Sequence, residues 1–122
     1  MKSGLKNKLM KFLESSLRNQ WLRGSHVSVY VRKGWHQGLD GKIHTYLDLA
    51  NIEVDQAFHH KGIFTDVLSL CQELTPYDGV LVESVLNEGL RTHLQRKVAQ
   101  DKNWHEKGFN FIWEKDGATG QI

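Results

Sequence analysis

Apolar residues near the N-terminus recur with the spacing of an amphipathic helix. The stripe consists of Leu5, Leu9, Phe12, Leu13 and Leu17. Gly24 follows this stripe, and because glycine commonly stops a helix we expect the helix to end there.

The next segment has the two-residue period of a strand with one covered face. Val27, Val29 and Val31 are the apolar positions of this strand. The stretch from Gly34 to Gly41 then contains three glycines and an Asp-Gly pair. Such a composition predicts a turn or a mobile loop, here between two antiparallel strands.

The apolar pattern changes phase between residues 43 and 54. Leu47 and Leu49 lie an even number of residues from Ile43 and would share its face of a strand. Ile52 and Val54 lie an odd number of residues away and would point to the other face. A β-bulge near Asn51 would explain the change, and bulges are common beside active sites. A strand that is buried on both faces would give the same letters, so both interpretations stay open.

The second half of the chain alternates helices and strands. Helical spacing predicts a helix that begins at Gly62 and stops at Thr75-Pro76, and a second helix capped by Asn87. Apolar runs predict a strand from Val80 to Leu86 and another at the end of the chain. The final strand would alternate Phe109, Phe111 and Trp113, and the last helix would bury Leu90, Leu94 and Val98. We therefore predict one domain, residues 1–122, with an α/β fold, a mixed sheet and a strand-helix-strand crossover between parallel strands from Ile43 to Leu86.

Composition excludes several classes of protein. With 39% hydrophobic residues, 25% charged residues and a net charge of +2, the chain has the balance of a soluble globular protein. It contains no apolar run of the length that a membrane span or a secretory signal requires, so we expect a cytoplasmic protein. Cys71, the single cysteine, falls on the apolar side of a predicted helix and is interpreted as a buried thiol.

A candidate anion site follows the strand that ends at Val54. The loop from Asp55 to Lys61 leads directly into the helix that begins at Gly62. Free backbone N–H groups and the positive end of the helix dipole meet at such a junction. Gly62 would let a phosphate approach the backbone closely, and Lys61 would add a positive charge.

The residues around this junction resemble the Gcn5-related N-acetyltransferase (GNAT) family. The family's pyrophosphate loop reads Arg or Gln, two residues, Gly, one residue, then Gly or Ala; here it is His59-His60-Lys61-Gly62-Ile63-Phe64. Residues 51–55 resemble the end of the family's splayed fourth strand, and residues 82–87 resemble its fifth strand and the next helix start. The resemblance covers roughly residues 43–94 and implies a small or trimmed acyl-CoA N-acyltransferase fold with splayed parallel strands.

The resemblance implies acetyl-coenzyme A, or coenzyme A, as the cofactor. The residues that it assigns to cofactor binding are Val54, His59, His60, Lys61, Gly62, Ile63, Phe64, Thr65 and Asn87. The motif departs from the family at His59 and at Phe64. We expect Phe64 to point into the core while nearby N–H groups hold the pyrophosphate. Asn87 has two compatible roles, as a helix cap and as a contact for the pantetheine arm.

The implied chemistry is direct attack of an amine on the thioester, for which one proton acceptor and one oxyanion donor suffice. By resemblance the base is Glu53 or Glu83, and the backbone N–H near Val54 polarises the carbonyl. Both carboxylates also have plain structural explanations, as an exposed strand residue and as one half of an ion pair. The general acid tyrosine of many family members is absent, because Leu94 occupies the corresponding position.

Three function classes remain. The first choice is an N-acetyltransferase acting on an amine of a small molecule, peptide or protein. The second is a non-catalytic relative that acts as a regulator or interaction module, and the third, ranked last, is a nucleic-acid-binding protein using the basic first helix. We predict no metal at His59-His60, since adjacent loop histidines do not converge on one ion. Tryptophans are interpreted as core or rim residues, and exposed ones would suit a homodimer.

Overall fold

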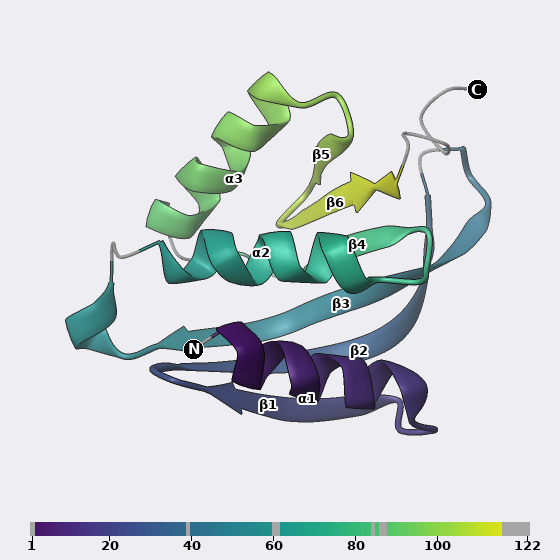
Figure 1. Cartoon of the computed structure of the whole chain (residues 1–122). Helices are drawn as coiled ribbons and strands as arrows, with labels where there is room; N and C mark the ends of the chain where they lie inside the picture. Colours follow the sequence, from purple (N-terminus) through teal and green to yellow (C-terminus); the bar gives the residue numbers. More distant parts are fainter. Residues whose placement is uncertain (1, 39, 60–61, 84, 86–87, 116–122) are drawn as a thin grey trace.

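The computed structural model describes residues 2–38, 40–59, 62–83, 85 and 88–115. These residues form three α-helices, six strands and one short 3-10 helix (Figure 1). In order they are α1 (Lys2–Glu14), β1 (Asn19–Gly24), β2 (Val27–Gln37), β3 (Ile43–Val54), η1 (Gln56–Phe58), α2 (Ile63–Leu74), β4 (Gly79–Val82), α3 (Glu88–Gln100), β5 (Trp104–Lys107) and β6 (Asn110–Glu114). Within the described residues, no helix is both long enough and apolar enough to cross a membrane.

All six strands form one mixed sheet in the order β1-β2-β3-β4-β6-β5. Strands β3 and β4 pair in parallel, and the other neighbours pair antiparallel. Helix α2 connects β3 to β4 and lies across them (Figure 1). The predicted α/β composition, the mixed sheet and the central strand-helix-strand unit are thus confirmed.

The N-terminal segment differs from its prediction. Helix α1 ends at Glu14, not at Gly24, and Leu17 lies beyond it with 50% of its surface exposed. Residues 19–24 form the edge strand β1, where Leu22 alone is buried. A single buried position gives no alternation of apolar and polar residues. The turn at Ser25-His26, which leads into β2, also lacks the Asn-Gly or Asp-Gly pair of common hairpins. For these reasons the strand was missed.

Strand β2 is longer than predicted. Val27, Val29 and Val31 are buried, as expected for one covered face. The strand continues through Gly34 as far as Gln37, so the predicted turn at Gly34 is wrong and the connection to β3 covers only residues 38–42. The antiparallel pairing of the two strands is confirmed.

A bulge interrupts the pairing of β2 with β3. Tyr30 lies opposite Asn51 and Val31 lies opposite Leu49, which leaves Ala50 as the extra residue of β3. The bulge is therefore confirmed, one residue before the expected position. It explains the change of phase in the apolar pattern.

The last strands depart from the predicted boundaries. Strand β4 ends at Val82, so Glu83 lies just beyond it. Strand β5 was not predicted, because Trp104 is its one buried residue. Strand β6 is confirmed around the buried Phe111, but Phe109 precedes the strand and is 60% exposed.

The helices cover one face of the sheet. Phe12, Leu68 and Leu94, one from each helix, belong to a single buried cluster with inward-facing strand residues. Cys71 lies in this cluster, which confirms it as a buried thiol, and burial raises its pKa to about 12. On the opposite face the buried apolar group contains no helix residue among those described, and we call it the helix-free face; its members are Tyr46, Leu81 and Ile112.

The four tryptophans divide evenly between interior and surface. Trp104 is buried and Trp113 is partly buried against the same core. Trp21 and Trp35 are 40% and 60% exposed. The guanidinium of Arg18 lies 4.3 Å from the centre of the Trp35 ring, so this exposed ring is a packing partner at the rim.

Candidate functional site

The parallel strands β3 and β4 run side by side for a short distance and then part. Their pairing ends at Leu49, opposite Val82. One further hydrogen bond, 3.0 Å long, runs from the N–H of Glu83 to the carbonyl of Leu49. Beyond this bond β3 continues beside β2 to Val54. The N–H of Val85, by contrast, donates a hydrogen bond to the carbonyl of Phe109, the residue before β6. The sheet therefore opens immediately after Leu49, at the bulge.

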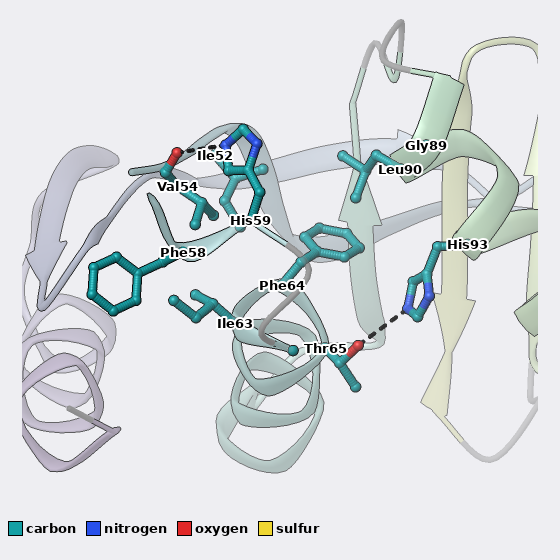
Figure 2. A pocket seen from close by; sticks show the side chains of 11 residues that line it. Ile52, Val54, Phe58, His59, Ile63, Phe64, Thr65, Gly89, Leu90 and His93 are labelled. Carbon is teal, nitrogen blue, oxygen red and sulfur yellow. Dashed lines mark hydrogen bonds between the residues drawn. The ribbon is translucent and has the colours of Figure 1, made fainter. Parts of the chain in front are cut away.

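A pocket of about 480 Å³ lies at this opening, on the helix-covered side. Figure 2 shows its wall, which comes from the outer part of β3, the segment after it, and the first turns of α2 and α3. Ile52 and Val54 of β3 face Leu90 of α3 across it. The pocket thus combines apolar side walls with the start of a helix.

Helix α2 begins at the pocket with a bare backbone. Gly62 is its N-cap residue, in the left-handed conformation with φ 79°, which glycine adopts without strain. Gly62 offers no side chain to cap the first turn, and a Cβ on Gly62 would meet no described atom within 4 Å. The N–H groups of a first turn and the positive end of the helix dipole form a common binding site for an anion.

His59 secures the chain just before this helix. Its Nε2 donates a hydrogen bond of 2.9 Å to the carbonyl of Val54, as Figure 2 shows. This bond ties the segment after β3 to the end of the strand. His59 therefore contributes to the shape of the pocket wall, with its ring exposed at the rim.

Phe64 and His93 form the opposite part of the wall. Their rings meet edge to face with centres 5.7 Å apart, and the Thr65 hydroxyl lies 3.3 Å from Nε2 of His93. Burial, with smaller contributions from two basic neighbours on α3, lowers the pKa of His93 and favours the neutral ring, which can accept this hydroxyl hydrogen. Phe64 packs against the core as expected, but its ring also lines the pocket (Figure 2).

A polar cluster lies on the helix-free face, at the point where the strands part. We define it as Arg32, His36, Asp48 and Glu83. Arg32 donates a hydrogen bond to Oε2 of Glu83, which raises the pKa of Arg32 and keeps it charged. Nε2 of His36 lies 2.8 Å from Oδ2 of Asp48. Burial raises the pKa of Asp48 to about 6, although the hydrogen bond to His36 works against this shift.

Gly34 makes room for this cluster. It lies between Arg32 and His36 along β2, on the same face. A Cβ at this position would lie 2.1 Å from Oδ2 of Asp48. The glycine therefore serves a close approach of side chains within a strand, and not a turn.

No family model matches this chain, and no curated protein matches it. Solved structures do resemble it in fold. One is a chain in the crystal structure of a KacTA–DNA complex, with a TM-score of 0.53 and 11% sequence identity. The similarity covers 78% of this chain and 61% of that chain, so this chain spans less than two thirds of its neighbour's length. At this identity the likeness concerns the fold alone.

The structure brings together most of the residues assigned to cofactor binding. Those that line the pocket are Val54, His59, Gly62, Ile63, Phe64 and Thr65. His60, Lys61 and Asn87 lie outside the described residues. Two neighbours in space, Leu90 and His93, were not assigned to the site, although their spacing along a predicted helix could have placed both on the side that faces α2.

The two candidate bases lie on the helix-free face, away from the pocket. Ile52 and Val54 line the pocket, so Glu53 between them points to the opposite side, where it is exposed. Glu83 is partly buried and pairs with Arg32. The ion pair considered for Glu83 from the sequence is thus present. Leu94, to which the resemblance assigns the position of the family's tyrosine, is fully buried.

Proposed function

We propose that this protein is an N-acetyltransferase of the GNAT type that binds acetyl-coenzyme A in the pocket at the start of α2. The observation that carries the proposal is the opening between the parallel strands β3 and β4, with a pocket and an uncapped helix start beside it. The family resemblance of residues 59–64 concerns the same helix start. Two independent features, a motif and a cavity, therefore coincide.

The pocket suits the two halves of coenzyme A differently. The first turn of α2, at Gly62 to Thr65, offers N–H groups to phosphate oxygens. The apolar walls formed by Ile52 and Leu90 suit a long, largely uncharged arm. When bound, the acetylated cofactor supplies the activated acyl group.

The acceptor amine would approach from the helix-free face. Glu53 and Glu83 both lie there, and the end of pairing between β3 and β4 after Leu49 would give the amine a route between the two faces. Glu83 lies where the strands part, whereas Glu53 lies farther out on β3. Of the two carboxylates we therefore favour Glu83 as the acceptor of the amine proton, with Arg32 fixing its orientation.

Cofactor binding is tested by titrating acetyl-coenzyme A into the protein and measuring heat. Leu90→Asp places a negative charge on the pocket wall and should weaken binding at least about tenfold, or about 1.4 kcal/mol. Thr92→Asp adds the same charge to an exposed position of the same helix turn and is the matched control. No heat from the wild type at millimolar ligand, or equal weakening by both variants, would contradict the proposal.

Catalysis is tested separately, by release of free thiol from acetyl-coenzyme A in the presence of an amine panel. Glu83→Gln should lower turnover by about 10²- to 10⁴-fold, the usual contribution of a general base. Glu53→Gln is compared beside it. If turnover survives in both variants, neither carboxylate is the base.

A non-catalytic role is the second candidate, and one observation favours it. Leu94, at the position that the resemblance assigns to the general acid, has no proton to give to a leaving thiolate, and its burial leaves no room there for a bound water to replace the acid. A chain that binds acetyl-coenzyme A without releasing thiol from any amine of the panel would be a binding or regulatory relative. The binding titration and the thiol-release assay together therefore separate the two candidates.

A further inference from the structure

Three side chains with metal-binding atoms meet on the helix-free face. His36 comes from β2, Asp48 from β3, and Glu83 from the residue after β4. One ligand atom from each lies within 4.8 Å of the other two. Two neighbouring strands hold His36 and Asp48, and Glu83 follows directly after the next strand of the sheet, so the set is supported by ordered elements.

Asp48 has an unmet bonding need inside this set. Its side chain is 3% exposed, and its Oδ2 is engaged by His36. Its other oxygen, Oδ1, is buried and has no hydrogen-bond partner among the described residues. A buried carboxylate oxygen without a partner is costly, and a bound cation would satisfy it.

Gly34 and Arg32, the neighbours of the three side chains, allow the ligand atoms to lie close together. Gly34 contributes no side chain between Asp48 and His36, and any Cβ there would lie 2.7 Å from Nε2 of His36. Arg32 holds Oε2 of Glu83, so the second oxygen of that carboxylate can take another partner. The guanidinium pairs with Glu83 and balances one negative charge of the cluster.

The chemistry of the set selects the class of ion. Mg²⁺ and Ca²⁺ prefer oxygen ligands alone, whereas an imidazole nitrogen with carboxylates suits transition metals. Zinc binds such atoms at about 2.0–2.2 Å, usually in tetrahedral geometry, so two ligand atoms on one ion lie about 3.3–3.6 Å apart. Because the three ligand atoms lie up to 4.8 Å apart, ion binding requires them to close by about 1 Å, and Nε2 of His36 must exchange its hydrogen bond to Asp48 for the ion. The partly exposed Glu83 can move toward the other two ligands together with Arg32.

We propose that His36, Asp48 and Glu83 form a binding site for a divalent transition-metal ion such as Zn²⁺ or Co²⁺. The site is distinct from the pocket on the other face, and it stands whether or not the chain transfers acetyl groups. If the chain does so with Glu83 as base, an ion at this carboxylate blocks the proton acceptor, so metal inhibits turnover without displacing acetyl-coenzyme A.

The test is titration of CoCl₂ into the chelator-treated full chain, followed by the visible absorption of bound Co²⁺ and by binding heat. The wild type should bind one ion, and Asp48→Asn and His36→Gln should each lower its affinity at least about tenfold. Glu53→Gln is the control, because Glu53 is exposed on the same face outside the cluster. Circular dichroism checks that each variant is folded. If Asp48→Asn does not fold, the metal affinity of His36→Gln alone tests the site.

Several outcomes would overturn the site. Absence of a Co²⁺ spectrum and of binding heat at millimolar metal is one. Unchanged affinity in His36→Gln is another, as is equal weakening in Glu53→Gln, since both indicate an adventitious surface ion only. Failure of acetyl-coenzyme A to bind leaves the metal result unaffected, so the two proposals fail independently.

Discussion

Replacing Gly34 by alanine tests how closely the polar cluster is packed. The new Cβ would lie 2.1 Å from Oδ2 of Asp48 and 2.7 Å from Nε2 of His36, both far inside van der Waals contact. Asp48 is buried and hydrogen-bonded to His36, so relieving one clash breaks that bond. The alanine therefore cannot be accommodated by moving a free side chain into solvent.

Overpacking of this kind costs about 1–3 kcal/mol of unfolding free energy. For a chain of this length each kcal/mol lowers Tm by about 4 °C, so Gly34→Ala should melt about 4–12 °C below the wild type. Thermal unfolding followed by circular dichroism measures the shift. Gly4→Ala is the control, because no described atom lies within 4 Å of a Cβ there and alanine favours helix α1 by up to about 1 kcal/mol.

Repeating the Gly34→Ala substitution in an Asp48→Ala variant identifies the contact that lowers the unfolding free energy. Asp48→Ala removes the carboxylate that the new Cβ approaches most closely. In this background Gly34→Ala should cost less than half of what it costs in the wild type, as coupled neighbours do. An unchanged Tm in Gly34→Ala, or equal costs in the two backgrounds, would refute the close packing described for the cluster.

Three further predictions concern the core and the loops. Cys71 should resist thiol reagents in the native protein at neutral pH and react after unfolding, because burial raises its pKa to about 12; fast labelling of native protein would contradict this. Leu94→Ala should lower the unfolding free energy by about 2–5 kcal/mol in denaturant titrations, and a cost well under 1 kcal/mol would show that the site is not core. His44 bonds Asp40 and Asp78, and chiefly the hydrogen bond to Asp40 raises the pKa of His44 above 6.5. Despite an opposing effect of burial, hydrogen bonds from the backbone and from His44 lower the pKa of Asp40 below 3.8. The stability advantage of wild type over His44→Gln should therefore be greatest between these values, fading as pH rises through the raised histidine pKa and as it falls through the lowered carboxyl pKa; an advantage independent of pH would exclude this ion pairing.

The elements that could be predicted from the sequence are those with several buried positions. Helix α2 buries Ile63, Val67 and Cys71 at helical intervals, so its period is visible in the letters. The edge strands bury one residue each, Leu22 in β1 and Trp104 in β5, and one residue has no period. Pairing with the next strand of the chain, β2 for β1 and β6 for β5, makes these segments strands, and no apolar period within either segment reports it.

The part of the site that consists of consecutive residues could be predicted from the sequence. The part that depends on the pairing of strands could not. The helix start at Gly62 follows from consecutive residues. Asp48 lies between two buried leucines and reads as the outward position of an ordinary strand, yet it is buried itself. Its environment is set by Gly34 and His36 on the adjacent strand, and the register that unites them cannot be counted from either segment alone.

The bulge at Ala50 connects the sequence pattern to the two faces of the site. In a regular strand Leu49 and Ile52 would point to opposite faces, because they are an odd number of residues apart. The extra residue restores Ile52 to the helix-covered side, where it lines the pocket, and turns Glu53 to the helix-free face. Bulges also bend and twist the strand that carries them, and this one falls immediately after the last pairing of β3 with β4. The same residue therefore accounts for the change of phase, for the apolar wall of the pocket and for the place where the strands part.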